Sequence, residues 1–215
     1  MQPALVPAED CRRCPRLAAF RDANRQALPA YHNAPVPAFG PLQSRLLIVG
    51  LAPGLHGANR TARPFTGDYA GDLLYATLGE FGFATGRYDR RPDDGLVPVD
   101  ARITNAVRCV PPENKPVGAE IANCHPFLEA EIAAMPSLRA MVALGKIAHD
   151  AVVRAWGLKL AAMPFAHGAL HRLSDRVTLA DSYHCSRYNT NTGRLTPPAF
   201  RRVFAEVRRL LDEAA

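Results

Sequence analysis

The sequence predicts an α/β fold with a mainly parallel sheet of four strands that helices cover on both faces. Four short apolar runs with the character of buried strands alternate along the chain with segments of helical periodicity. This alternation implies right-handed crossover connections between parallel strands. The chain has 215 residues, of which 48% are hydrophobic, so we expect one domain over residues 1–215 with a substantial core.

The strand predictions rest on apolar runs that stop at loops rich in Gly, Asn, His or Pro. The first, Arg45–Gly50, is apolar without interruption after its first residue, which is typical of a strand buried on both faces of a parallel sheet. The other three predicted strands, in chain order, are Ile103–Val110, Met141–Gly145 and Val177–His184.

Helices are predicted where apolar residues recur at helical spacing between these strands. In Gly71–Gly82, for example, Leu74, Leu78 and Phe81 fall on one face of a helix. Residues 1–44 are rich in proline and are predicted to be irregular apart from one short helix. The predicted helices are Pro15–Gln26, Gly71–Gly82, Gly118–Met135, Lys146–Gly157 and, with proline near its start, Pro197–Ala214.

Three loops follow the carboxyl ends of predicted strands, namely Leu51–Thr66, Pro111–Pro116 and His184–Thr196. Ligands of open α/β sheets bind beyond the carboxyl ends of the strands, so we expect these loops to converge on one site. The first loop is not a phosphate-binding loop, because it lacks the G-K-[ST] signature and its glycines do not fit G-x-G-x-x-G.

The composition bears on the partner and the location. A formal net charge of +6 is compatible with nucleic acid as a partner, but an arginine-rich genome composition explains the same bias. No apolar run is long enough to predict a membrane span, and the segment that begins MQPALVP lacks the basic and apolar regions of a signal peptide. We expect a monomeric cytoplasmic protein, nucleoid-associated in a prokaryote, with no membrane partner.

The five cysteines suit metal binding better than disulfides, since the count is odd and a cytosolic location is expected. Cys11 and Cys14 form a C-x2-C pair, and Cys109 and Cys124 form a C-x14-C pair. Four thiolates brought together suit Zn²⁺ or a [4Fe–4S] cluster, and the spacing does not separate these two. Scattered buried cysteines are the alternative, and Cys185 is left over as a small core residue.

Two residues at the end of the first loop are candidates for chemistry. Phe65 suits either stacking on a nucleic-acid base or packing in the core. Asp68 suits either capping of the helix that follows or positioning of a water molecule. Composition and spacing leave both pairs of alternatives open.

Three segments together resemble a known family. They are GLAPGLHGANRTARPFTGDYAG (50–71), TNAVRCVPPENKP (104–116) and HCSRYNTNTGRLT (184–196). Their order and spacing, with the four paired cysteines, resemble the family 5 uracil-DNA glycosylases, the type B branch of that superfamily. The resemblance extends from Cys11 to the last predicted helix. One difference is Cys185, which stands where the third segment of the family commonly has Pro or Val.

The resemblance implies a three-layer αβα sandwich with a central four-stranded, mainly parallel sheet. It implies a monofunctional DNA-repair glycosylase that flips uracil, and also hypoxanthine and other deaminated or damaged bases, out of DNA before hydrolysing the N-glycosidic bond. Ala52, expected in the base pocket, stands where most other families of the superfamily have Asp, Glu or Asn. The usual water-activating residue is therefore missing from that position. The resemblance also implies that a structural [4Fe–4S] cluster binds Cys11, Cys14, Cys109 and Cys124.

The chemistry of base excision suggests roles for the remaining candidates. An amide both donates and accepts hydrogen bonds, so Asn105 is the expected reader of the base edge. Asn114 is a second contact, unless it is only a turn residue, and Phe65 is the stacking partner. His184 is expected to donate to the carbonyl oxygen of the departing base. Asp68 guides the water, unless water traps the sugar cation without a side-chain base.

The third segment is expected to contact DNA. Leu195 is a candidate to wedge into the base stack. The alternative function is a non-catalytic nucleic-acid-binding module stapled by a four-cysteine metal site, which would not require the catalytic candidates to converge. The expected DNA-binding residues are Ser186, Asn189, Thr192, Gly193 and Arg194, of which Arg194 suits a phosphate.

Overall fold

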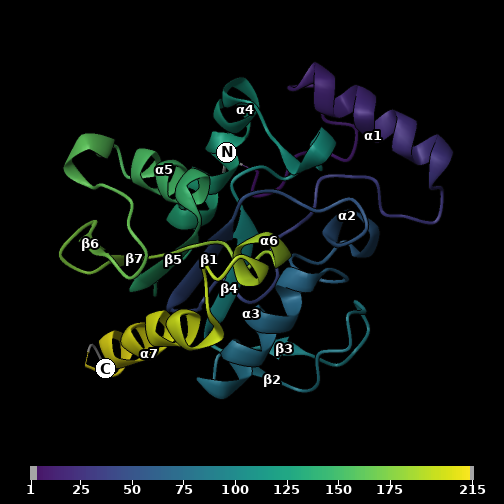
Figure 1. Cartoon of the computed structure of the whole chain (residues 1–215). Helices are drawn as coiled ribbons and strands as arrows, with labels where there is room; N and C mark the ends of the chain where they lie inside the picture. Colours follow the sequence, from purple (N-terminus) through teal and green to yellow (C-terminus); the bar gives the residue numbers. More distant parts are fainter. Residues whose placement is uncertain (1–3, 214–215) are drawn as a thin grey trace.

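The computed structural model describes residues 4–213, and its centre is a five-stranded sheet with the strand order β4-β1-β5-β7-β6 (Figure 1). Residues 1–3 of the predicted irregular segment and Ala214 of the last predicted helix lie outside the described residues. The prediction of a mainly parallel sheet is confirmed. The four predicted strands pair in parallel as β1 Leu46–Gly50, β4 Ala101–Asn105, β5 Ala140–Leu144 and β7 Thr178–Ser182.

The predicted count of four strands is one too low. The fifth strand, β6, spans Leu170–Arg172 and pairs antiparallel with β7 at the edge of the sheet. Its three residues, Leu-His-Arg, are exposed or half-buried, so no apolar run marks them in the sequence. An edge strand of this length is held by the hydrogen bonds of its single neighbour rather than by burial of its own side chains.

The five predicted helices are all present within residues 4–213. They are α1 Pro15–Ala27, α3 Tyr69–Glu80, α4 Gly118–Ala133, α5 Lys146–Ala155 and α7 Pro197–Glu213. Shorter elements are the helices α2 Ala58–Thr61 and α6 Arg187–Asn191, the 3-10 turns η1 Pro112–Asn114 and η2 Leu160–Ala162, and a small sheet of β2 Ala84–Thr85 and β3 Val97–Pro98. None of the described helices is both long and apolar enough to cross a membrane.

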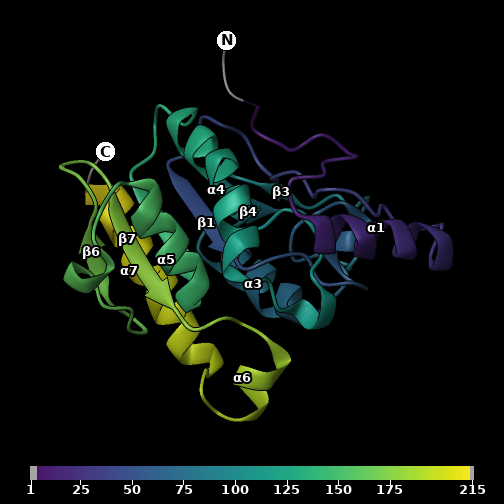
Figure 2. The ribbon, with the colours of Figure 1, turned by 90° about the horizontal axis from the view of Figure 1, so that it is seen from above.

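Alternate residues of the strands enter two cores, one on each face of the sheet. Ile48 of β1 packs with Leu74 of α3 and Phe204 of α7. Val49, the next residue, packs on the opposite face with Val152 of α5, in a core that α4 also joins. Helices α5 and α7 accordingly lie on opposite sides of the sheet in Figure 2, which gives the predicted three layers. Because β1 is buried on both faces, its run is apolar without alternation.

Two strands end two or more residues earlier than predicted. β4 stops at Asn105 rather than Val110, because Arg108 turns toward α4 and its guanidinium pairs with the fully buried Glu131. This turn takes the chain away from the sheet and toward the N-terminal segment. β7 stops at Ser182, two residues before its predicted end, so the residues that follow belong to a loop.

Candidate active site and metal centre

The three loops that were predicted to converge line one open cleft of about 530 Å³ beyond the ends of β1, β4 and β7. Among residues 4–213, Asp68 is the one acidic side chain in its walls. Asn189, Thr192, Gly193 and Arg194 lie outside this cleft, on α6 or just after it. The predicted residues that line the cleft are Ala52, Phe65, Asp68, Asn105, Asn114, His184 and Ser186.

The two carboxylate oxygens of Asp68 face different surroundings. Oδ1 accepts from the backbone N–H of Ala70 at 3.1 Å and of Gly71 at 3.3 Å, so Asp68 caps α3 and the helix begins two residues before its predicted start. Oδ2 faces the cleft loop, where a Cβ on Gly54 would lie 3.2 Å from it and one on Gly57 would collide with it. Burial raises the pKa of Asp68. The residue is a helix cap and a cleft carboxylate at once.

Phe65 and Asn105 meet above Gly50, the last residue of β1. A Cβ on Gly50 would lie 2.5 Å from Cζ of Phe65 and would collide with Oδ1 of Asn105, so only glycine fits there. Asn105 is 3% exposed, yet its amide makes no hydrogen bond with any other of residues 4–213. The Phe65 ring stacks on the His184 ring at 5.8 Å between centroids. Phe65 therefore belongs to the core and to the cleft wall.

Asn114 is a turn residue, and it also lines the cleft. It has a left-handed φ of 58° and a backbone N–H that donates to the Pro111 carbonyl. Its Oδ1 also lies 3.9 Å from the position of a Cβ on Gly54, which places it opposite Asp68 in the cleft. The absence of a side chain at Gly54 keeps the space between these two residues open.

His184 is half-buried in the cleft wall, and its ring makes no hydrogen bond within the described part of the chain. Burial lowers the pKa of His184 to about 4, so the imidazole is neutral near pH 7 and donates through one N–H. Its backbone is held by Asn189, whose Nδ2 donates to the His184 carbonyl at 2.8 Å. His184 thus offers a neutral donor, and Asn189 orders the loop that carries it.

The loop from 184 to 196 folds around α6. Ser186 caps this helix, because its Oγ accepts from the Asn189 N–H at 3.4 Å. Arg194 is exposed and lies 4.6 Å from the centre of the Tyr183 ring. Leu195 is fully buried, so the expectation that it wedges into DNA is wrong. Tyr188, by contrast, is 72% exposed on α6.

Sequence reasoning missed three further side chains of the cleft. His56 lines it, and Nδ1 of His56 lies 3.0 Å from the Tyr31 hydroxyl oxygen. Tyr69 and Arg187 also line it, and the guanidinium lies 5.4 Å from the Tyr69 ring. All three stand in or beside the motif segments. The sequence did not predict that these three side chains point into the cleft, because the cleft loops have no regular periodicity.

The four paired cysteines line one small cavity together with Arg21 and Phe127. Cys14 stands directly before α1, Cys109 follows the turn after β4, and Cys124 lies on α4. The structure brings together the two pairs that the sequence separates by about half its length. Cys185 lies elsewhere, fully buried, with its Sγ 3.4 Å from the Ala70 carbonyl.

The surroundings of this cavity suit bound thiolates. The Arg108 backbone N–H donates to Cys124 Sγ at 3.3 Å, and the Asn123 amide donates to Cys14 Sγ at 3.7 Å. Burial and, to a lesser extent, the neighbouring Cys124 raise the pKa of Cys109 to about 12. A free thiolate is therefore costly here, and a cation is needed to stabilise one.

The spacing of the sulfur atoms can be compared with that of a zinc site. A tetrahedral zinc site with Zn–S bonds of 2.3 Å would hold its sulfurs about 3.8 Å apart. Within the described residues no three cysteine sulfurs lie within 4.8 Å of one another. The described sulfurs therefore do not stand at the spacing of a bound tetrahedral zinc ion, although all four thiols line the same cavity.

Comparison with known proteins agrees with this site. Residues 37–208 match the model of the Uracil DNA glycosylase superfamily. A type-5 uracil-DNA glycosylase of Thermus thermophilus is 45% identical over 93% of each chain. One of Mycobacterium leprae is 44% identical over 93% of this chain and 91% of its own, and one of Pyrobaculum aerophilum is 41% identical over 87% and 83%. The chain therefore belongs to the type-5 branch of the uracil-DNA glycosylase superfamily.

Proposed function

We propose that the chain removes uracil from DNA in base-excision repair by the concerted action of the cleft residues. Membership of the type-5 branch makes it a uracil-DNA glycosylase, a hydrolase that acts on N-glycosyl bonds. One observation carries the proposal for the site. The unpaired amide of Asn105, the neutral imidazole of His184 and the carboxylate of Asp68 line the same cleft.

Recognition uses the amide and the aromatic ring. The target nucleotide leaves the stack, because a base within a duplex cannot reach side chains at the floor of a cleft. Asn105 then pairs with the edge of the base, because its amide lines the cleft and is free to donate and accept there. Phe65 stacks on the base, Ala52 lines the pocket without a polar atom, and Asn114 adds a contact at the rim.

Catalysis divides between His184 and Asp68. The bond breaks with negative charge on the departing base and positive charge on the sugar. The neutral His184 donates its N–H to a carbonyl oxygen of the base, and this bond strengthens as the charge develops. Asp68 stabilises the sugar cation through Oδ2 and orients the attacking water, which takes over the task that Ala52 cannot perform.

DNA lies along α6 and the residues around it. Ser186, Asn189, Thr192 and Gly193 approach the backbone, and Arg194 contacts a phosphate. Tyr188 projects from this surface with 72% of its area exposed, so it fills the gap in the stack in place of Leu195. A planar side chain suits that task because it stacks on the bases left behind.

The substrate range includes purine bases such as hypoxanthine and other deaminated or damaged bases. The cleft is open, its volume is about 530 Å³, and Gly54 contributes no side chain that would exclude a second ring. Asn105 can donate and accept toward either base edge, because its amide has both functions.

A [4Fe–4S] cluster binds Cys11, Cys14, Cys109 and Cys124. The four thiols that line one cavity and the N–H donors to two of their sulfurs support a metal centre, and the family resemblance favours the iron–sulfur cluster over zinc. When bound, the cluster supplies a structural cross-link between the N-terminal segment, the turn after β4 and α4, and no catalytic step passes through it. The chain acts as one domain, because Ala52 belongs both to the cleft and to the packing around the cysteines, and we propose that it acts as a monomer.

Base release tests the proposal. Oligonucleotides with a single uracil or hypoxanthine, single- or double-stranded, are incubated with the protein and cleaved at abasic sites by alkali. We expect cleavage at the modified base. A protein that binds these oligonucleotides but releases no base would support the alternative of a binding module. His184→Ala is the matched control, since it keeps the DNA-binding surface of α6.

A further inference from the structure

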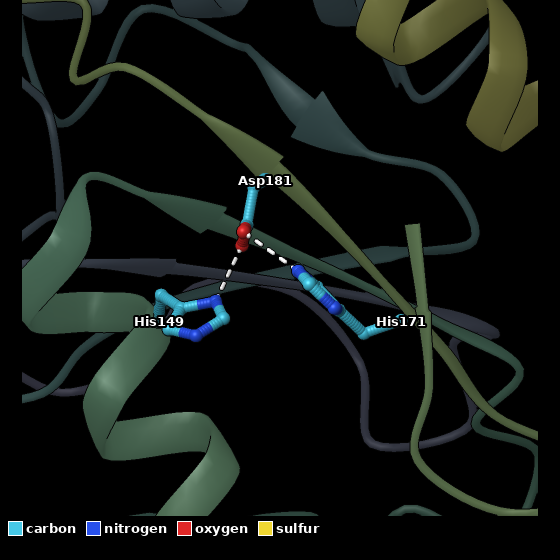
Figure 3. A group of neighbouring side chains, drawn as sticks. All are labelled: His149, His171 and Asp181. Atoms are coloured by element: carbon cyan, nitrogen blue, oxygen red, sulfur yellow. Dashed lines mark hydrogen bonds and ion pairs between the residues drawn. The ribbon is translucent and has the colours of Figure 1, made fainter. Parts of the chain in front are cut away.

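A second group of ionisable side chains lies outside the cleft. His149 of α5, His171 of β6 and Asp181 of β7 point toward one another from three elements (Figure 3). Asp181 is 0% exposed and His149 is 1% exposed. Asp181 Oδ1 accepts from His149 Nδ1 at 2.7 Å, and Oδ2 accepts from His171 Nε2 at 3.0 Å and from the Ala166 N–H at 3.3 Å. We call these three side chains the clasp.

The ring of His149 faces an acceptor on each side. Nε2 lies 2.8 Å from the Met163 carbonyl oxygen, which can only accept, so Nε2 carries a proton. Nδ1 faces the Asp181 carboxylate at 2.7 Å and must carry a proton as well if that carboxylate is ionised. An imidazole with two protons is a cation, and its charge compensates that of the buried carboxylate.

The distances in the clasp favour protons over a metal ion. Two ligand atoms on one tetrahedral metal ion with bonds of 2.0–2.1 Å would lie about 3.3 Å apart. The 2.7 Å between Nδ1 of His149 and Oδ1 of Asp181 is instead the length of a charge-assisted hydrogen bond. Removing the Nδ1 proton would place a lone pair against a carboxylate oxygen.

The groups that face His149 favour the cation. From β7 it meets Asp181, from β6 His171, and from the segment before β6 the Met163 carbonyl and the Phe165 ring. Burial alone would lower the pKa of His149, but the hydrogen bond and charge of Asp181 raise it above the ordinary value, as does Asp150 of α5 to a lesser extent. Asp150 is itself paired with Lys146 at 2.6 Å.

The clasp is connected to the wall behind His184. The backbone of Asp181 accepts from the Gly168 N–H at 2.8 Å and donates to the Ala169 carbonyl at 2.9 Å. The segment held in this way carries Phe165 and His167, and His167 stacks on Tyr183 at 5.1 Å with 10° between the rings.

Tyr183 directly precedes His184 in the chain. Its backbone N–H donates to Nδ1 of His167 at 3.2 Å. Phe165, Tyr183 and His184 line a common cavity of about 280 Å³. The path from the clasp to His184 thus runs through one short segment and one aromatic stack.

We propose that His149, Asp181 and His171 are positioning residues, in which a His149 imidazolium clasps residues 163–169 against Tyr183 and thereby sets the place of His184. The positioning of His184 rests on the function proposed above. The charge state of His149 does not depend on that function, so the charge state and the positioning are measured separately.

The first measurement reads protons directly. The full-length protein is labelled with 15N-histidine, and the two ring nitrogens of His149 are assigned by comparison with His149→Gln. We expect both nitrogens to be protonated at pH 7. A free imidazole, with a pKa of about 6.5, is mostly neutral at that pH. A His149 ring with one bare nitrogen at pH 7, or zinc bound at one equivalent to the clasp, would overturn the proposal.

The second measurement reads positioning. In single-turnover assays on a uracil oligonucleotide, His149→Gln should lower the rate by roughly tenfold to a hundredfold, the cost of misplacing a catalytic group by about 1 Å, while the Kd for DNA stays unchanged. The wild-type rate should fall as pH rises through the elevated pKa of His149, and the variant should lack that fall. His125→Gln, on α4 outside the clasp, is the matched control.

The outcomes separate the two proposals. A variant with the wild-type rate and pH profile overturns the positioning role, even if His149 is a cation. A wild-type protein without glycosylase activity overturns the proposed function, while the nitrogen spectra still decide the charge state of His149. If His149→Gln does not fold, Asp181→Asn gives a second test, because it removes the charge, keeps the shape and should release one proton from His149.

Discussion

Replacement of Asp68 by Ser and by Ala separates its two roles. Ser caps helices about as well as Asp, but its hydroxyl is too short to cap α3 and also reach the cleft at Gly54 and Gly57. Ala does neither. We expect both variants to lose about 10²–10⁴-fold in single-turnover rate on every accepted base, because the sugar and the water are common to all of them. That loss corresponds to about 3–5 kcal/mol of activation free energy.

The free energy of unfolding should distinguish the same two variants. Asp68→Ala loses the cap, which costs about 0.5–2 kcal/mol. Asp68→Ser keeps it and no longer buries a carboxylate. Burial raises the pKa of Asp68, so its ionisation opposes folding at neutral pH, and the Ser variant should be at least as stable as wild type. Urea unfolding and single-turnover kinetics supply both numbers. A Ser variant with the wild-type rate would return Asp68 to the role of a cap alone.

Four further predictions follow from the same geometry. Phe65→Ala should weaken processing of uracil DNA by about 1–3 kcal/mol in single-turnover assays, and an unchanged rate would make Phe65 a core residue only. Gly50→Ala should destabilise the fold by about 1–3 kcal/mol in urea unfolding, because the added Cβ meets the Phe65 ring at 2.5 Å. His184 should gain a second ring proton only near pH 4 in the folded protein, whereas the unfolded chain binds that proton at higher pH. The free energy of unfolding should therefore fall as the pH drops from about 6.5 toward 4, and a His184→Gln variant should lose this dependence. Purified protein should hold about four iron atoms per chain, Cys11→Ala should lose iron and stability, and Cys185→Ala should keep the iron; stoichiometric zinc after anaerobic purification would contradict the cluster.

The parallel strands could be predicted because a strand that is buried on both faces has an uninterrupted apolar sequence. Every residue of β1 and β5 is buried, and their sequences are apolar throughout. Strand β6 has no apolar run that would predict it. It is positioned by its pairing with β7 and by the hydrogen bond of His171 to Asp181. An element held by a distant partner cannot be read from its own residues.

The candidate site shows the same division. The convergence of the three loops was predictable from strand order, because the carboxyl ends of parallel strands share one edge. The direction of each side chain was not. Leu195 and Tyr188 stand seven residues apart in one polar segment, yet the first is fully buried and the second is 72% exposed. The clasp could not be predicted from the sequence either, because His149 and Asp181 face each other only after α5 packs on the sheet.

The thiol of Cys185 changes how the loop of His184 is restrained. A proline at this position would restrict its own backbone and that of His184 before it, whereas Cys185 Sγ lies 3.4 Å from the Ala70 carbonyl in the first turn of α3. Asp68 caps that turn, so the thiol links the loop of His184 directly to the helix that begins at Asp68. The contact of Cys185 with Ala70 therefore restrains the loop of His184 against α3, a restraint between two segments that a proline ring, which has no donor, could not provide.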